Sequence, residues 1–139
     1  MSSEDATAAV QSWIEAFNGK DLDASAQLLA PEYVRHDANL PDVIGPGAEI
    51  EFLQGVHAAF PNLHFTVQQM VAEDRIVVTR LQARGTHQGE FLGVPPTGRD
   101  VSVLAMETFR VAEGKLVEQW VLMDALGLLQ QLGAIPAAT

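Results

Sequence analysis

Glu107 and Gln119 have the residue types and the spacing that acid–base chemistry on a small molecule requires. They lie in two alternating segments, 101–111 and 116–123, which a tight turn joins into a β-hairpin. A carboxylate on an apolar concave face loses hydration, so its pKa rises toward the range in which it exchanges protons near neutral pH. We therefore expect Glu107 to carry a proton in a pocket and Gln119 to orient a carbonyl oxygen there.

The turn at Ala112–Gly114 sets which side chains of this hairpin meet. A three-residue loop ending in a left-handed glycine suits Ala-Glu-Gly, because glycine adopts that conformation without steric cost. This loop predicts that Val111 pairs with Lys115, which places Glu107 opposite Gln119. Because side chains alternate along a strand, one face of the hairpin then carries seven residues: Ala105, Glu107, Phe109, Val117, Gln119, Val121 and Met123. An apolar face with one carboxylate and one amide is typical of a small-molecule pocket.

Glu107 also has a structural interpretation, since at the rim of the sheet it would stay hydrated or pair with Arg80 or Arg84. Arg80 could instead assist the chemistry at the pocket mouth. His36 and Asp37 are neighbours, so a strand would direct them to opposite faces, whereas a loop lets both reach the mouth. There His36 could act as a base or donor near neutral pH, or bond only to the backbone.

The other histidines show no spacing typical of a metal site. His57 either lines the cavity or packs in the core, and His87 is interpreted as a turn residue. Neither His64 nor His87 has a second ligand at helical or hairpin distance, so we expect no metal and no other cofactor. Asp124 directly precedes an apolar helix, so we interpret it as an N-cap and not as a catalytic group.

Two groups of apolar side chains suggest surfaces for binding. One would wall a cavity for a flat or apolar ligand, although a small core uses the same residue types: Trp13, Phe17, Tyr33, Phe52, Phe60 and Phe91. The other lies on the opposite face of the hairpin: Leu104, Met106, Leu116, Trp120 and Leu122. So many apolar groups on one surface predict burial against a partner, and we expect a homodimer through this outer sheet face.

The periodicity of the chain changes from helical to alternating at Leu63. Apolar spacing predicts helices over 3–18, 21–29 and 48–59, with Ser3 or Asp5 capping the first. The segment Tyr33–Asn39 leads into a loop rich in proline and glycine. Alternation predicts strands over 63–74, 74–85, 101–111 and 116–123. Helices followed by an antiparallel meander indicate an α+β domain, whose strongly curved sheet wraps round the helices.

Composition narrows the class of partner. The 139 residues fit one domain, and the absence of cysteine fits a reducing cytoplasm. A net charge of −10 disfavours binding to nucleic acids and to anionic membranes, and no apolar run is long enough to span a bilayer. The acidic, polar start does not resemble a targeting signal. We expect a cytoplasmic protein whose partner is an apolar small molecule.

Five stretches of the chain resemble the SnoaL-like polyketide cyclase family, within the superfamily of cone-shaped folds named after nuclear transport factor 2. They are 13–18, 33–37, 60–67, 85–99 and 114–133, which read WIEAFN, YVRHD, FPNLHFTV, GTHQGEFLGVPPTGR and GKLVEQWVLMDALGLLQQLG. The resemblance implies about three helices on a curved antiparallel sheet, paired into a dimer through the sheet's outer face. It also implies ring closure of polyketides by an intramolecular aldol reaction without metal or cofactor.

The reacting residues of those cyclases differ from the residues here. By the resemblance, their acid–base aspartate falls on Val121, a common histidine on Gln119 and a pocket histidine on Glu107. Limonene-epoxide hydrolases share the fold, and the final aspartate of their Asp-Arg-Asp set also falls on Val121.

Three functional hypotheses remain. The first is a cofactor-independent enzyme that enolises, isomerises, cyclises or hydrates an apolar carbonyl or epoxide compound. The second is a protein that binds a hydrophobic ligand without turnover, and the third is a dimeric interaction module.

Overall fold

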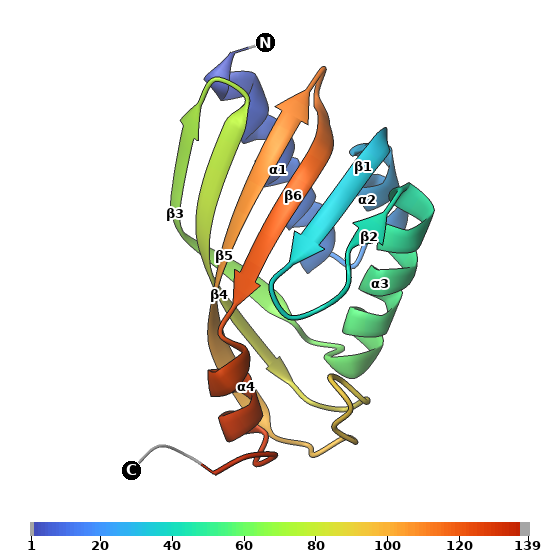
Figure 1. The fold of residues 1–139 in the computed structure, drawn as a ribbon, viewed down its shortest axis with the longest axis vertical. Coiled ribbons are helices and arrows are strands. Elements are labelled where there is room, and N and C mark those ends of the chain that lie inside the picture. Colours follow the sequence, from blue (N-terminus) through green and yellow to red (C-terminus); the bar gives the residue numbers. More distant parts are fainter. Residues whose placement is uncertain (1, 137–139) are drawn as a thin grey trace.

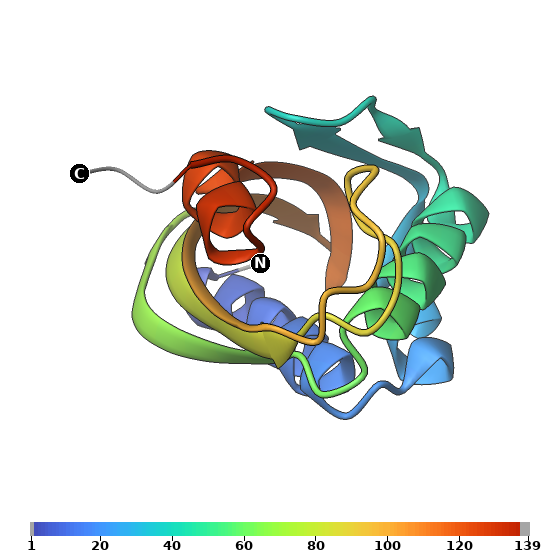
Figure 2. The same ribbon diagram turned by 90° about the horizontal axis from the view of Figure 1, so that it is seen from below.

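The computed structural model describes residues 2–136, in which helices pack against the concave face of a curved six-stranded sheet (Figures 1 and 2). The helices are α1 Ser3–Asn18, α2 Leu22–Gln27, α3 Pro46–Ala59 and α4 Ala125–Gln131. The strands are β1 Leu29–Asp37, β2 Val43–Ile44, β3 His64–Glu73, β4 Ile76–Thr86, β5 Asp100–Ala112 and β6 Lys115–Met123. Their order is β2-β1-β6-β5-β4-β3, antiparallel except for the β1–β6 pair. The predicted α+β class is confirmed.

The segment that leads into the proline- and glycine-rich loop is a strand, β1, which continues to Asp37 before the loop begins. It lies parallel to β6, with Arg35 opposite Gln119, and covers the edge that an antiparallel meander alone would leave open. Alternation along β1 directs Arg35 and Asp37 to the concave face and His36 to the outer face.

The turn of the β5–β6 hairpin is tighter than expected. Ala112 pairs with Lys115, so only Glu113 and Gly114 form the loop, with φ angles of 53° and 76°. The predicted pairing of Val111 with Lys115 is therefore wrong. Two consecutive left-handed residues close a two-residue turn whose twist matches that of the strands, which favours this shorter loop.

A β-bulge follows the turn, because Val111 pairs with Leu116 and leaves Val117 without a partner residue. The bulge turns Leu116 inward, where it is fully buried, so its expected place on the outer face is wrong. Glu107 now lies opposite Val121, two residues from the predicted register. A displacement by two residues preserves the facing of side chains, and the predicted concave face is therefore observed.

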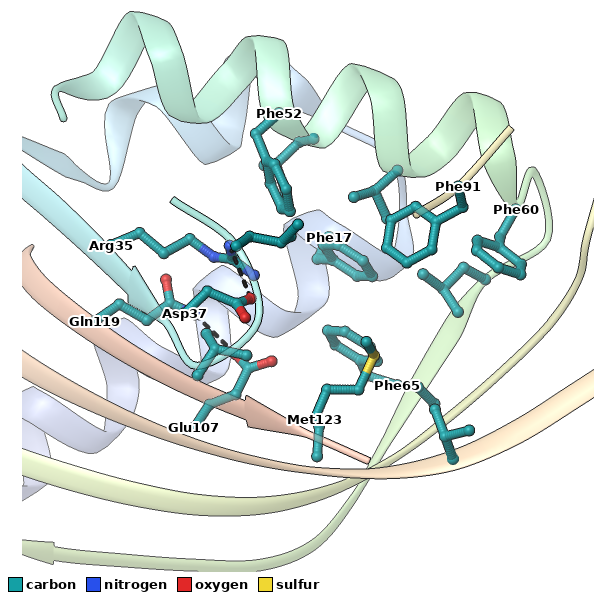
Figure 3. A pocket seen from close by; sticks show the side chains of 18 of the residues that line it. Phe17, Arg35, Asp37, Phe52, Phe60, Phe65, Phe91, Glu107, Gln119 and Met123 are labelled. Atoms are coloured by element: carbon teal, nitrogen blue, oxygen red, sulfur yellow. Dashed lines mark hydrogen bonds and ion pairs between the residues drawn. The ribbon is translucent and has the colours of Figure 1, made fainter. Parts of the chain in front are cut away.

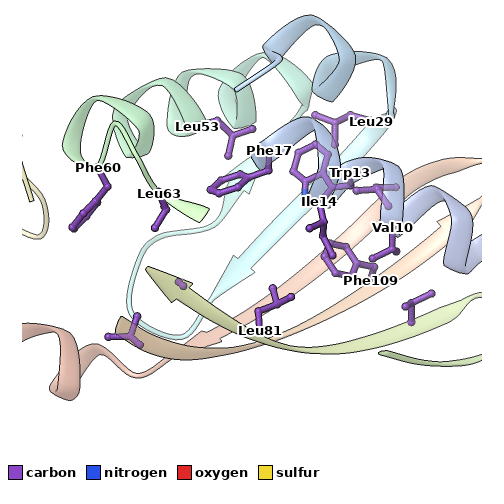
Figure 4. Close-up of a cluster of buried hydrophobic side chains, with 14 of the residues drawn as sticks. Val10, Trp13, Ile14, Phe17, Leu29, Leu53, Phe60, Leu63, Leu81 and Phe109 are labelled. Carbon is purple, nitrogen blue, oxygen red and sulfur yellow. The ribbon is translucent and has the colours of Figure 1, made fainter. Parts of the chain in front are cut away.

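Helix α1 packs its apolar side against the concave face of the sheet (Figure 4). The buried residues on this side of the helix include Ala6, Ala9, Val10, Trp13, Ile14 and Phe17. The helix begins after Ser2, which forms a reciprocal capping box with Asp5, and the expected cap at Ser3 is corrected. Helix α4 begins after the predicted cap Asp124, whose carboxylate accepts the Gly127 N–H at 2.8 Å.

Candidate active site

A pocket lies between the concave face of the sheet, helices α1 and α3, and the loop that carries Phe91 (Figure 3). Its apolar wall includes Trp13, Phe17, Phe52, Phe60, Phe65, Phe91, Val121 and Met123, all except Phe65 expected from the sequence. Its polar wall consists of Arg35, Asp37, Glu49, Glu107 and Gln119. Figure 3 shows the polar groups gathered at one end and most of the aromatic rings toward the other.

Glu107 faces the pocket from β5 and is held there by its neighbours (Figure 3). Gln119 Nε2 donates to Glu107 Oε1 at 2.8 Å, and the Tyr33 hydroxyl donates to Gln119 Oε1 at 2.6 Å. Burial raises the pKa of Glu107, against the opposing effects of Arg35 and the Gln119 hydrogen bond. Burial also raises the pKa of Tyr33, which therefore stays a donor. This chain of hydrogen bonds fixes the orientation of the Glu107 carboxyl group.

A charged cluster that the sequence analysis missed completes the polar wall. Arg35 Nη1 lies 3.3 Å from Asp37 Oδ2, and Arg35 Nε lies 3.9 Å from Glu49 Oε1. The guanidinium carbon of Arg35 lies 4.2 Å from the centroid of the Phe52 ring, a cation–π contact. Arg35 is 8% exposed and Glu49 is 1% exposed, so water screens these charges weakly.

Glu49 enters the pocket from the first turn of α3, which begins at Pro46 rather than at Ala48. Burial raises the pKa of Glu49 to about 7, although Arg35 acts in the opposite direction. A carboxyl group with that pKa can donate or accept a proton near neutral pH. The signal for Glu49 in the sequence is its spacing from Leu53, four residues later on the buried side of the helix.

Asp37 supplies another carboxylate of the polar wall. It pairs with Val121 of β6, so its side chain lies next to Val121 on the concave face. Its Oδ1 accepts the Asn39 N–H at 2.7 Å, and its Oδ2 faces Arg35. The signal for Arg35 and Asp37 is the alternation of Tyr33, Arg35 and Asp37 along β1, which becomes visible only once that segment is recognised as a strand.

His36 is not part of the pocket wall, contrary to expectation. Its Nε2 lies 2.6 Å from a Glu118 oxygen and its Nδ1 lies 3.1 Å from an Asp42 oxygen. The imidazole also stacks on Trp120, with 5.7 Å between ring centroids. Hydrogen bonding to Glu118 raises the pKa of His36, on the outer face of the sheet. His36 lies outside the pocket because successive residues of β1 point to opposite faces of the sheet, and Arg35 takes the concave face.

Arg80, His57 and Tyr33 also lie outside the pocket wall. Arg80 pairs across the sheet with Met106 on the outer face, where it cannot reach the concave side. His57 packs against Phe17, with ring centroids 4.8 Å apart, and burial lowers the pKa of His57. Tyr33 is fully buried and reaches the site only through Gln119.

Within residues 2–136, no three His, Cys, Asp or Glu side chains are grouped so that they could hold a metal ion. Over the same residues, no helix has the length and apolarity needed to cross a membrane. The chemistry that the pocket residues themselves offer is proton transfer by carboxyl groups, with a guanidinium and an amide as donors.

The sequence matches the profile of the SnoaL-like polyketide cyclase family over residues 7–132. The chain belongs to this family. One SnoaL-like relative is nogalonic acid methyl ester cyclase of Streptomyces nogalater, which is 30% identical over 124 residues, or 86% of this chain and 91% of that protein. This membership confirms the resemblance seen in the sequence.

Solved structures agree with the SnoaL-like assignment. AclR of Streptomyces galilaeus, a proposed hydroxylase, is 31% identical with a TM-score of 0.87, covering 99% of this chain and 87% of its own. IdmH of Streptomyces antibioticus, a proposed polyketide cyclase, is 34% identical with a TM-score of 0.80, covering 92% and 98% respectively. The predicted cone-shaped architecture is therefore shared with these proteins.

Proposed function

We propose that this protein is a cofactor-independent acid–base enzyme that cyclises or isomerises an apolar carbonyl compound, with Glu107 as the proton carrier. The observation that supports this proposal is the position of Glu107. It is a buried carboxyl group with a raised pKa, directed into a mostly apolar pocket at its polar end and oriented by Gln119. In that setting, a carboxylate can take a proton from the carbon next to a carbonyl group.

The proposed reaction is a ring closure of the aldol type. The Glu107 carboxylate removes a proton from carbon, and the resulting enolate attacks a second carbonyl carbon of the same molecule. Gln119 has a different role from the one expected, because its amide oxygen accepts from Tyr33 while its amide nitrogen donates to Glu107. We therefore assign Gln119 to positioning the carboxylate rather than to holding the substrate carbonyl.

The names of relatives suggest the class of substrate. Aklanonic acid methyl ester cyclase of Streptomyces peucetius is 28% identical over 127 residues, and the S. nogalater relative acts on nogalonic acid methyl ester by its name. The aromatic end of the pocket suits the apolar body of such a molecule, and the polar end suits its oxygen atoms. An epoxide substrate is a weaker alternative within the same acid–base chemistry.

The test is turnover of nogalonic and aklanonic acid methyl esters, followed by chromatography and mass spectrometry for a product of unchanged mass. Glu107→Gln should lower kcat by about a hundredfold or more, because only proton exchange is lost from an isosteric side chain. Ester affinity should remain nearly constant. Glu51→Gln, an exposed change on α3, is the matched control and should leave kcat unaltered. Full activity of Glu107→Gln would remove this residue from the mechanism.

A ligand-binding protein without turnover is the second candidate. It is favoured by Val121, which stands where the resemblance places the acid–base aspartate of the cyclases. In that case the same esters should raise the melting temperature as their concentration rises, and no product should form on long incubation.

We also propose a cytoplasmic homodimer that associates through the outer sheet face. The support is a patch of exposed apolar side chains on β5 and β6, formed by Leu104, Met106, Trp120 and Leu122. Such a patch is costly to leave in contact with water, and a second copy of the chain would cover it symmetrically. An interaction module with no use for its pocket would share this surface but show no response to ligand.

A further inference from the structure

We propose that Glu49 and Arg35 form a second reacting group in the pocket, which receives a carbonyl oxygen of the substrate and protonates it as the new bond forms. This inference rests on the proposed function, because it assigns the step that complements proton removal by Glu107. It adds two residues, from α3 and β1, to a mechanism so far confined to the β5–β6 hairpin.

This group comes from other elements of the fold than Glu107. Glu49 projects from α3 and Glu107 from β5, and Arg35 of β1 lies in the polar wall with both. Figure 3 shows Arg35 and Glu107 at the same end of the pocket. Arg35 Nε is 3.9 Å from Glu49 Oε1, too long for a direct hydrogen bond. A substrate oxygen that reaches this cluster would meet a guanidinium and a carboxyl group together.

Two polar atoms of this cluster lack a hydrogen-bond partner among the described residues. They are Nη1 of Arg35, which makes an ion pair with Asp37 but no well-aligned hydrogen bond, and Oε1 of Glu49. Both residues are more than nine-tenths buried and both line the pocket. Buried polar atoms in folded proteins are almost always paired, so an unpaired donor beside an unpaired acid marks a place for a ligand atom.

The ligand atom that fits is an oxygen that accepts hydrogen bonds first and a proton afterwards. A carbonyl oxygen accepts an N–H of Arg35 and the O–H of protonated Glu49. When the enolate attacks the carbonyl carbon, the π electron pair moves onto this oxygen, and the Arg35 charge stabilises the oxyanion. The Glu49 proton then completes the alcohol.

Protons and electrons balance over the proposed step. One carbon–hydrogen bond breaks toward Glu107, one carbon–carbon bond forms, and one proton leaves Glu49, so the product is an isomer of the substrate. Glu107 ends protonated and Glu49 ends ionised, and exchange with water restores both. No oxidant, reductant or co-reactant is needed.

The surroundings of Glu49 are consistent with this role. The charged and titratable groups that act on it are Arg35 and Tyr33 from β1 and Glu107 from β5. Desolvation raises the pKa of Glu49 to about 7, so near neutral pH a substantial fraction carries the proton that the oxyanion needs.

The inference can be tested by ligand binding, independently of turnover, with methyl naphthyl ketone and ethylnaphthalene as probes. These two compounds have nearly the same shape and differ by one carbonyl oxygen. In titration calorimetry at a pH below the pKa of Glu49, the ketone should bind about tenfold more tightly than the hydrocarbon. The advantage should shrink at a pH well above that pKa, because ionised Glu49 no longer donates.

Variants separate the two residues of the group. Arg35→Met should remove most of the ketone advantage, because it removes both the charge and the N–H donors. If the methionine variant does not fold, Arg35→Lys should reduce the advantage, since the shorter ammonium keeps the charge but not the planar set of donors. Glu49→Gln should keep the advantage and abolish its pH dependence, since an amide donates at every pH. The exposed Glu51→Gln should behave as the unaltered protein.

Several results would overturn the inference: equal affinity for both probes, no binding of the ketone, or a pH dependence that survives in Glu49→Gln. Failure of the proposed function would look different, because it would show as absent turnover of the methyl esters or as an active Glu107→Gln variant. The two outcomes are therefore distinguishable.

Discussion

The Tyr33 hydroxyl donates a 2.6 Å hydrogen bond to Gln119 Oε1, across the parallel pair of β1 and β6. This bond decides which end of the Gln119 amide faces Glu107. With the oxygen engaged by Tyr33, the NH2 group points to the carboxyl group and donates to it at 2.8 Å. A fully buried tyrosine outside the pocket wall thus orients Glu107 indirectly, through Gln119.

We predict that Tyr33→Phe lowers the free energy of unfolding by about 1–3 kcal/mol, because it leaves a buried amide oxygen without a donor. The variant should also lower kcat, because the Gln119 amide is then free to rotate and its hydrogen bond to Glu107 weakens. Urea denaturation and turnover of the methyl esters measure the two effects.

A double-mutant cycle provides the control for the Tyr33 prediction. In a Gln119→Leu background the acceptor is absent, so adding Tyr33→Phe should cost much less than it does in the unaltered protein. Equal costs in both backgrounds would show that the hydroxyl does not act through Gln119.

We predict a second effect at Glu49, on the pH dependence of stability. The pKa of this carboxyl group is about 7 in the folded protein and close to 4.5 in an unfolded chain, so the folded state binds the proton more tightly. Between these pH values the folded state holds more protons, and the free energy of unfolding must fall as pH rises. Glu49→Gln has no carboxyl group to titrate at this position, so its free energy of unfolding should not show this fall. As pH rises from acid to mildly alkaline values, the stability of the variant relative to the unaltered protein should increase by roughly 3 kcal/mol.

Urea unfolding at several pH values from about 4.5 to 8 measures this difference directly. Glu51→Gln changes the same formal charge on the exposed side of α3 and should give a nearly constant difference. A constant difference for Glu49→Gln as well would mean that this carboxyl group titrates normally and is not desolvated.

The concave face of the hairpin is predictable from the sequence, because alternation preserves side-chain facing when the register is displaced by two residues. The expected pairing of Glu107 with Gln119 is wrong by two residues, yet a shift by two keeps every side chain on its face. Leu116 shows the limit of that argument, because the bulge at Val117 adds one residue and reverses its direction.

The cluster of Arg35, Asp37 and Glu49 was not predictable in the same way. Arg35 and Asp37 face the pocket because β1 pairs in parallel with β6, a contact between distant segments that local periodicity does not reveal. A glutamate in the first turn of a helix ordinarily favours the helix dipole from the surface. Glu49 is instead buried against Arg35. Its spacing from Leu53 indicates the buried side of the helix but does not reveal the partner on β1.

We predict that Leu122→Glu yields a monomer if the outer sheet face is a dimer interface. Leu122 is 59% exposed in the single chain, so a charge there should cost little folding energy but should be expelled from an apolar interface. Sedimentation equilibrium should show the mass of one chain for Leu122→Glu and of two chains for the unaltered protein. Leu126→Glu, at a residue that is 61% exposed on α4, is the control and should remain dimeric.

The last prediction concerns the loop that carries Phe91 into the pocket. This loop is docked on the end of α3, where the N–H groups of Gln88 and Gly89 both donate to the Ala59 carbonyl oxygen. A Cβ atom on Gly89 would lie 2.7 Å from the carbonyl oxygen of Ala58, and backbone cannot move aside as a flexible side chain can. Gly89→Ala should therefore lower the free energy of unfolding by about 1–3 kcal/mol and weaken ester binding, as the loop lifts with its aromatic residue.

Gly55→Ala, in the helix on which this loop docks, is the matched control for Gly89→Ala. Gly55 lies within α3 and a Cβ atom there would meet nothing within 4 Å, so alanine should stabilise the helix by about 0.5–1 kcal/mol. Opposite signs in urea denaturation would attribute the loss at Gly89 to contact with the helix end. Equal, small effects at both positions would show that the loop is free to move, and that Phe91 is not held against the pocket by its docking.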